Sequence, residues 1–120
     1  MKDIFCRIID GEIPGKVIFE DKLLMVIMDV NPRSDGHLLV IPKRHYKDIK
    51  DIDNEVLFHI MLIAKKMCLL IEEKLKCDGV TLEQNNGINQ EVKHFHLHII
   101  PSYKNKKGIS DIETIYNKLI

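Results

Sequence analysis

The sequence carries no excess of charge of either sign, because eighteen lysine and arginine residues balance eighteen aspartate and glutamate residues. A strongly basic domain attracts nucleic acid or anionic lipid through its overall field, and this chain lacks such a field. We therefore expect neither nucleic acid nor a membrane as a partner. Any charged ligand has to be recognised by a local arrangement of side chains.

Cysteine is scarce, and the three cysteines are widely separated at Cys6, Cys68 and Cys77. An odd, scattered set does not fit the disulfide framework of a secreted protein and is typical of reduced thiols. Long apolar runs are also missing near the N-terminus, where charged residues interrupt each apolar stretch. We expect no signal peptide or membrane span there, and we predict a cytoplasmic protein.

Proline and glycine are few, four and six in 120 residues, while 45% of the residues are hydrophobic. A chain of this size buries one core. We predict a main domain over residues 1–103, followed over 104–120 by a linker and a short helix. Ser110 and Glu113 have the spacing of a capping box for that helix.

Apolar and β-favouring runs predict strands at 17–19, 23–28, 37–41, 79–83 and 94–100, the first two forming a hairpin. Residues 54–76 instead repeat their apolar positions every three or four residues, which predicts one long helix with Asp53 as its cap. This order of elements favours an α+β fold with a mostly antiparallel five-stranded sheet.

The apolar stripe of the long helix is wider than packing on one sheet face requires. We predict that part of it pairs with a second copy of the chain, so that a homodimer forms through residues 54–76. The alternative is that loops of the same chain fill this width.

Half of the six histidines lie on one face of the last strand, where His94, His96 and His98 alternate with apolar residues. This row spans about 13 Å at the usual rise of a strand, which is too long for all three to ligate one metal ion without a sharp bend. Nucleophilic catalysis, in which one imidazole attacks while others orient it and donate, uses all three at this spacing. A histidine metalloenzyme, with chelator-sensitive activity, stays open beside it.

The segment His94-Phe-His96-Leu-His98-Ile-Ile resembles the signature of the histidine triad (HIT) family, and the similarity to its Hint-type branch covers roughly residues 3–103. The combined order of the motifs is more specific than any one of them. The resemblance implies a HIT-like fold. The other matching segments are Gly11-Glu-Ile-Pro14-Gly-Lys, Met28-Asp29-Val-Asn-Pro32, Gly36-His37-Leu-Leu-Val-Ile-Pro42 and Gln90-Glu-Val-Lys-His94.

The resemblance also implies an activity, the cleavage of purine nucleoside phosphoramidates or related conjugates of AMP or GMP at the α-phosphate. His96 matches the nucleophile, which would carry the nucleotide as a covalent intermediate. His98 would bind a phosphate oxygen and assist the leaving group, and His94 and His37 would orient the nucleophile. The chemistry would require no cofactor.

Further matches concern the nucleotide. Asp29 matches the carboxylate that holds the ribose hydroxyls, its alternative being a turn acid before Asn31-Pro32. Asn85 and Gln90 match side chains on the phosphate side. Four apolar residues would line a purine slot, their alternative being ordinary core: Phe5, Ile8, Ile13 and Ile27.

The sequence departs from the family pattern beside the triad. The loop over residues 85–90 is about two residues shorter than usual, Asn89 replaces a glycine, and Glu91 replaces the serine that in animal Hint proteins helps the leaving amine depart. These departures keep a second class open, a non-catalytic purine nucleotide-binding regulatory protein, which would show affinity without turnover.

Some bacterial family members hold a structural zinc ion with two cysteines and two histidines. The corresponding set here is Asp3, Cys6, His45 and His94, with a carboxylate in place of one thiolate. Such a set can ligate zinc tetrahedrally, although the oxygen ligand weakens a soft site. The alternative is an inert Cys6 and a surface His45.

Overall fold

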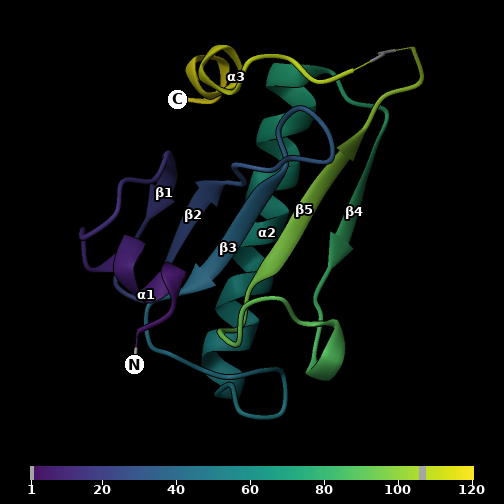
Figure 1. Cartoon of the computed structure of the whole chain (residues 1–120). Helices are drawn as coiled ribbons and strands as arrows, with labels where there is room; N and C mark the ends of the chain where they lie inside the picture. The colour runs from purple at the N-terminus through teal and green to yellow at the C-terminus, as the bar shows by residue number, and fades with distance from the viewer. Residues whose placement is uncertain (1, 106–107) are drawn as a thin grey trace.

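The computed structural model describes residues 2–105 and 108–120, and at its centre lies one five-stranded antiparallel sheet of order β1-β2-β3-β5-β4. This confirms the predicted α+β fold. In Figure 1, α2 lies behind the sheet, while α1 lies in front of its β1–β3 side. The elements are α1 (Ile4–Ile9), β1 (Val17–Glu20), β2 (Leu24–Met28), β3 (Leu38–Pro42), α2 (Asn54–Leu75), β4 (Gly79–Glu83), the 3-10 helix η1 (Gly87–Asn89), β5 (Leu97–Ser102) and α3 (Ile112–Leu119).

Helices cover both faces of the sheet, which is why β2 is apolar at every position. Leu24 and Val26 face the main core with α2, whereas Met25 and Ile27 face a smaller cluster that contains Phe5 of α1. The sequence analysis did not predict α1. A helix of six residues is too short to display a periodic apolar pattern, although Asp3 accepts a hydrogen bond from the Cys6 backbone nitrogen as its cap.

The long helix α2 packs only part of its apolar surface on the sheet. Ile60 and Ile71 are fully buried, but Phe58 and Leu69 are 68% and 60% exposed. The predicted cap Asp53 occupies the N-cap position without a capping hydrogen bond, because its carboxylate accepts from the Tyr46 hydroxyl at 3.1 Å. Among the described residues, no helix combines the length and apolarity that crossing a membrane requires.

The last strand differs from the prediction at both ends. It begins at Leu97 rather than at residue 94, because the Phe95 backbone nitrogen donates to the Tyr46 carbonyl, at 2.7 Å, and not to a strand. It also continues through Pro101. Register with β3 reaches only to Ile99, so the missing proline N–H interrupts no ladder on that side.

The turn before β3 approaches the end of α2 closely. Gly36 has a φ of +89°, and a Cβ atom placed on it would lie 2.4 Å from a methyl carbon of Leu75. The positive φ therefore favours glycine here, and a larger residue would also require the Leu75 side chain to move. The turn delivers the next residue, His37, to the beginning of the strand.

The C-terminal helix α3 begins one residue later than the capping-box prediction. Asp111 is the cap and accepts from the Thr114 backbone nitrogen, whereas the Ser110 backbone nitrogen donates to Asp35, 2.7 Å away. Ile115 and Leu119 are buried in the main core. The division at residue 104 stays a prediction; in the predicted linker, residues 106 and 107 lie outside the described part of the chain.

Candidate active site

Successive side chains of β5 point to opposite faces of the sheet. Leu97 and Ile99 belong to the core beneath α2, so His98 lies on the opposite face, next to Leu39 of β3 and Glu83 of β4 in the sheet register. His96 joins the same side just before the strand begins. The structure thus gathers two of the triad histidines on the face that α1 partly covers.

The tautomer of His96 follows from one hydrogen bond. Its Nδ1 lies 2.8 Å from the backbone carbonyl of His94, and a carbonyl can only accept, so Nδ1 carries the hydrogen. The neutral ring therefore presents an unprotonated Nε2. His96 is only 6% exposed, and its ring centroid lies 4.9 Å from that of Phe5, in an edge-to-face arrangement. The imidazole is therefore held in a defined orientation, with Nε2 able to accept a hydrogen bond or attack an electrophile.

His37 and His98 form a second ordered pair. The Arg33 backbone nitrogen donates to Nδ1 of His37 at 3.1 Å, which leaves the hydrogen of neutral His37 on Nε2. Nε2 of His37 lies 2.9 Å from Nδ1 of His98 and donates to it. The hydrogen of neutral His98 is then on Nε2, the nitrogen left to donate to a ligand.

Burial keeps this pair neutral. Burial, with the charges of His96, His37 and Arg33, lowers the pKa of His98 from 6.5 to about 4. Burial likewise lowers the pKa of His37, although the Asp29 carboxylate opposes the shift. One Asp29 oxygen lies 3.4 Å from Nε2 of His37 and 4.0 Å from Nδ1 of His98.

Two cavities meet at these histidines. One, here called the polar cavity, has a volume of about 470 Å³. The other, here called the apolar slot, has a volume of about 340 Å³ and lies against α1. Both are lined by Asp29, Glu91, His96 and His98. An apolar and a polar compartment that share imidazoles suit a ligand with an apolar end and a polar end.

The four apolar residues predicted for a purine slot all line the apolar slot: Phe5, Ile8, Ile13 and Ile27. Asp29 lines both cavities, and its turn role is observed, whereas its role towards a ribose stays a prediction. One of its oxygens accepts from the Asn31 backbone nitrogen at 2.9 Å, as a turn acid does, while the other faces the histidine pair.

The two predicted phosphate-side residues lie in different places. Asn85 lines the polar cavity and donates to Glu83 at 3.2 Å. Gln90 lines neither cavity, because its side chain turns inward and donates to the Lys47 carbonyl at 2.6 Å. Its Oε1 is buried and has no hydrogen-bond partner within the described residues. Asn89 lies on the polar cavity instead.

An ion pair at the wall of the polar cavity was not predicted from the sequence. Arg33 meets Glu83 through two hydrogen bonds, Nη1 to Oε1 at 3.0 Å and Nη2 to Oε2 at 2.6 Å. These bonds help to lower the pKa of the Glu83 carboxyl to about 2. The partners are separated by 50 residues in the chain and belong to no local motif, so no sequence signal pointed to them.

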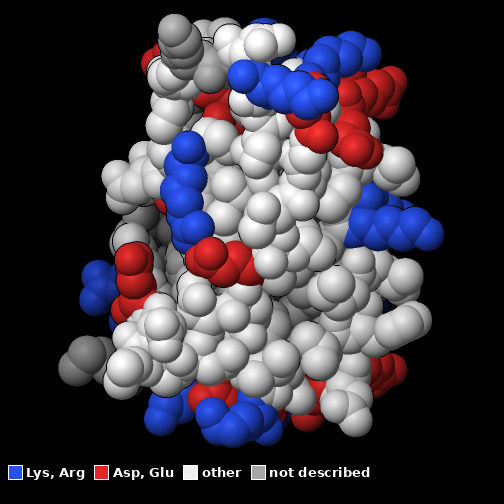
Figure 2. Space-filling model, turned by 90° about the vertical axis from the view of Figure 1, so that its right-hand side faces the viewer, with Lys and Arg blue, Asp and Glu red and all other residues white. Residues whose placement is uncertain are grey.

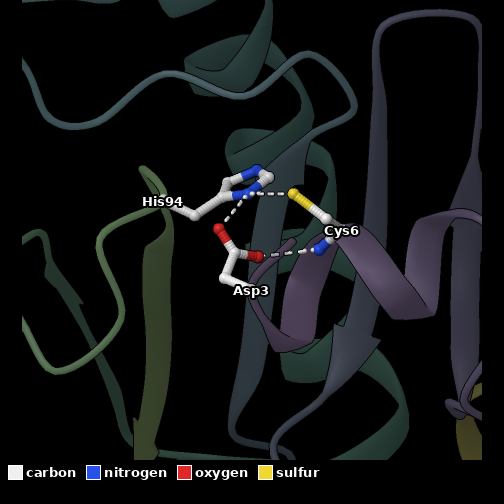
Figure 3. Close-up of side chains that lie close together, drawn as sticks. All are labelled: Asp3, Cys6 and His94. Atoms are coloured by element: carbon white, nitrogen blue, oxygen red, sulfur yellow. Dashed lines mark hydrogen bonds and ion pairs between the residues drawn. The ribbon is translucent and has the colours of Figure 1, made fainter. Parts of the chain in front are cut away.

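Three of the four predicted metal ligands converge beside the triad, from α1 and from the segment before β5 (Figure 3). His94 is fully buried, and its Nε2 donates to the Pro42 carbonyl at 2.9 Å. Its Nδ1 therefore bears the lone pair in the neutral ring. That nitrogen faces Asp3 Oδ2 at 3.1 Å and Cys6 Sγ at 3.5 Å.

This arrangement fits a bound cation. Burial lowers the pKa of His94, and hydrogen bonds from Cys6, with His94 nearby, lower the pKa of the Asp3 carboxyl although burial opposes them. The unprotonated Nδ1 of His94 thus faces the Asp3 carboxylate. The thiol hydrogen of Cys6 is the only hydrogen that these three groups can share. Nitrogen, sulfur and oxygen ligands in this arrangement suit zinc. His45 lies at the edge, with Nε2 3.2 Å from Asp3 Oδ2.

The chain matches the family model described as the HIT domain over residues 10–105. It is 44% identical over 103 residues to an uncharacterized HIT-like protein of Methanocaldococcus jannaschii, a match that covers 84% of this chain and 79% of that protein. It is 40% identical over 108 residues to the adenosine 5'-monophosphoramidase of Saccharomyces cerevisiae, covering 88% of this chain and 66% of the yeast enzyme.

A solved structure is also similar to this chain in its fold. The zinc-bound histidine triad family protein of Mycobacterium smegmatis superimposes with a TM-score of 0.89 at 32% identity. The match covers 99% of this chain and 91% of the mycobacterial one.

Proposed function

Because the chain belongs to the HIT domain family, we propose that it is a nucleoside phosphoramidase or related nucleotide hydrolase that cleaves purine nucleotide conjugates at the α-phosphate. The observation that carries this proposal is His96, which lines both the apolar slot and the polar cavity and whose hydrogen bond through Nδ1 leaves Nε2 of the neutral ring unprotonated. The activity named for the yeast relative supports the same class of reaction. The assignment to the Hint-type branch remains a prediction.

The two cavities give the substrate an orientation. A purine base fits the apolar slot, where Phe5 and Ile27 offer flat and branched apolar surface. Asp29 at the junction would accept hydrogen bonds from the ribose hydroxyls. The α-phosphate would then lie at His96 and His98, and the leaving group would extend into the polar cavity.

The first chemical step forms a bond between His96 Nε2 and phosphorus and breaks the bond from phosphorus to the leaving nitrogen. His98 is neutral before substrate binds, but a phosphate charge next to it stabilises the imidazolium. His98 would take up a proton from solvent on Nδ1 as substrate binds and donate the hydrogen on Nε2 to the leaving nitrogen, which departs as an amine. Before this uptake, His37 donates to Nδ1 of His98 and orients the ring so that Nε2 is left for the ligand.

The second step returns His96 to its starting state. Neutral His98 can accept a proton from water while the water oxygen bonds to phosphorus and the bond between phosphorus and His96 Nε2 breaks. The product is the nucleoside monophosphate. The hydrogen on His96 Nδ1 stays bonded to the His94 carbonyl throughout, which keeps attack on the same nitrogen.

A structural zinc ion would be held by Asp3, Cys6 and His94, with His45 as the fourth ligand after a small movement of its half-exposed ring. It would supply no chemistry to the reaction. Its effect would be to fix His94, whose carbonyl orients His96. The zinc-bound mycobacterial neighbour supports the presence of such a site in the family.

The exposed apolar stripe of α2 supports a homodimer. Phe58, Met61, Leu62 and Leu69 are all at least 45% exposed, and Leu82 continues the apolar surface onto the edge strand β4. Figure 2 shows this side of the molecule, with a large uncharged area in its middle. A second copy would cover that area, and a monomer in sedimentation at micromolar concentration would contradict the pairing. The cytoplasmic location also remains a prediction, supported by three free cysteines.

The nucleophile provides the direct test. His96→Ala should abolish turnover of adenosine 5'-phosphoramidate and remove the mass of the covalently bound nucleotide from the quenched protein. The matched control is His59→Ala, which changes a histidine on α2 outside both cavities. This variant should keep the turnover and the covalently bound nucleotide. Undiminished turnover by His96→Ala would overturn the proposal. Nucleotide affinity without turnover by the unmodified protein would instead favour the non-catalytic binding protein.

A further inference from the structure

The polar cavity has an excess of negative charge. Its lining contains three carboxylates, Asp29, Glu83 and Glu91, against one guanidinium group, that of Arg33. Two of its histidines, His37 and His98, are held neutral by burial. A leaving group that enters this cavity therefore meets a net negative wall.

The one guanidinium group is already engaged. Both terminal nitrogens of Arg33 are bonded to the Glu83 carboxylate in a fork, at 3.0 and 2.6 Å. Glu83 also accepts from Asn85 at 3.2 Å. A phosphate or carboxylate on the leaving group would have to displace Glu83 to reach this cation, at the cost of two charge-assisted hydrogen bonds. The pair thus offers little to an anionic leaving group.

Glu91 is the carboxylate in the lining that remains available. Asp29 is engaged with the Asn31 backbone and faces His37. Glu91 is exposed and makes no hydrogen bond or ion pair within residues 2–105 and 108–120, yet it borders both cavities beside His96 and His98. Its charge is placed close to the departing group.

From this arrangement we propose that Glu91 is a specificity-determining residue that favours amine leaving groups carrying a second, positively charged group and disfavours anionic ones. The preferred substrate class is a purine nucleoside phosphoramidate of a diamine or another amine with a cationic end. The inference rests on the proposed function. The chemical step is unchanged: the phosphorus–nitrogen bond breaks, and the released nitrogen takes one proton from His98.

Three adenosine 5'-phosphoramidates of similar chain length test the proposal, those of 1,4-diaminobutane, n-pentylamine and 4-aminobutyrate. The wild-type protein should cleave them with kcat/KM falling in that order. One unit charge at about 4 Å changes an interaction by roughly fivefold even in water, so the cationic and anionic substrates should differ by at least about tenfold. The ratio should shrink as salt is added.

Variants of Glu91 test whether its charge causes the preference among the three substrates. Glu91→Gln should lower the ratio between the cationic and anionic substrates towards one, and Glu91→Lys should lower it further. Glu55→Gln removes the same charge from the first turn of α2 and should leave the ratio as in the wild type. The ratio within each variant is the readout, so a general loss of activity does not obscure it. Equal kcat/KM for the three substrates, or a Glu91→Gln ratio equal to the wild-type ratio, would overturn the proposal.

The same three substrates distinguish a failure of this inference from a failure of the proposed function. If the wild-type protein cleaves none of the three conjugates, the hydrolase assignment fails. Calorimetric affinities of the intact conjugates then test the charge preference directly, and the order cation, neutral, anion is again expected. Equal affinities would overturn the preference, whereas cleavage of all three at one rate would overturn it and leave the hydrolase assignment intact.

Discussion

Two clusters that contain histidines lie on either side of His96, and they differ in how their hydrogens are distributed. In the His37–His98 pair, each donor meets an acceptor, from the Arg33 backbone nitrogen through His37 to His98. In the cluster of Asp3, Cys6 and His94, three groups with lone pairs converge. A hydrogen-bond chain in which each donor meets an acceptor needs no metal ion, whereas converging lone pairs favour a cation.

The largest effect is expected when the proposed proton donor in the His37–His98 pair is removed. His98→Asn should lower kcat for an adenosine phosphoramidate of an alkyl amine by about 10²- to 10⁴-fold, the usual contribution of general acid–base catalysis. The loss should be much smaller for adenosine 5'-(4-nitrophenyl phosphate), because nitrophenolate departs without a proton. Equal losses for both substrates would show that His98 only binds the phosphate.

The metal cluster should respond to a different change. Cys6→Ala removes one ligand, and we expect zinc affinity to fall at least about tenfold, measured by competition with a chromophoric chelator. Cys68→Ala, a half-buried cysteine on α2, is the matched control. If both variants retain zinc equally, or if wild-type protein binds none, the three side chains do not form a metal site.

The smallest effect should appear in the pH dependence of stability. The pKa of His98 is lowered from 6.5 to about 4, so protonation favours the unfolded state. The stability that depends on neutral His98 is fully present above about pH 6.5 and is lost as the pH falls towards about 4. The urea midpoint of metal-free protein should therefore fall between pH 7 and pH 4.5.

His98→Asn should reduce this fall without removing it, because burial also lowers the pKa of His37 and of His94. If the midpoint of the variant falls as steeply as that of the wild type, His98 is not the group held neutral in the folded protein.

Sequence periodicity predicted the sheet and the long helix because both elements repeat a pattern over many residues. Short elements did not follow from it: α1 has six residues, and the beginning of β5 is set by a bond between Phe95 and Tyr46. Contacts between residues that are far apart in the chain could not be predicted from the sequence either. Arg33 and Glu83 carry no local signal, and the inward turn of Gln90 depends on the Lys47 carbonyl. The cluster around His94 was expected only through family resemblance.

The close approach at Gly36 links two parts of the molecule that share no ligand. The last turn of α2 ends at Leu75, whose side chain fills the space where a larger residue at position 36 would extend. His37 follows directly in the chain. The end of the helix with the exposed apolar stripe thus lies directly behind the turn that leads into His37. If two copies pair through α2, a shift of that helix would reach this turn through the Leu75 side chain, and the turnover rate would then change with protein concentration.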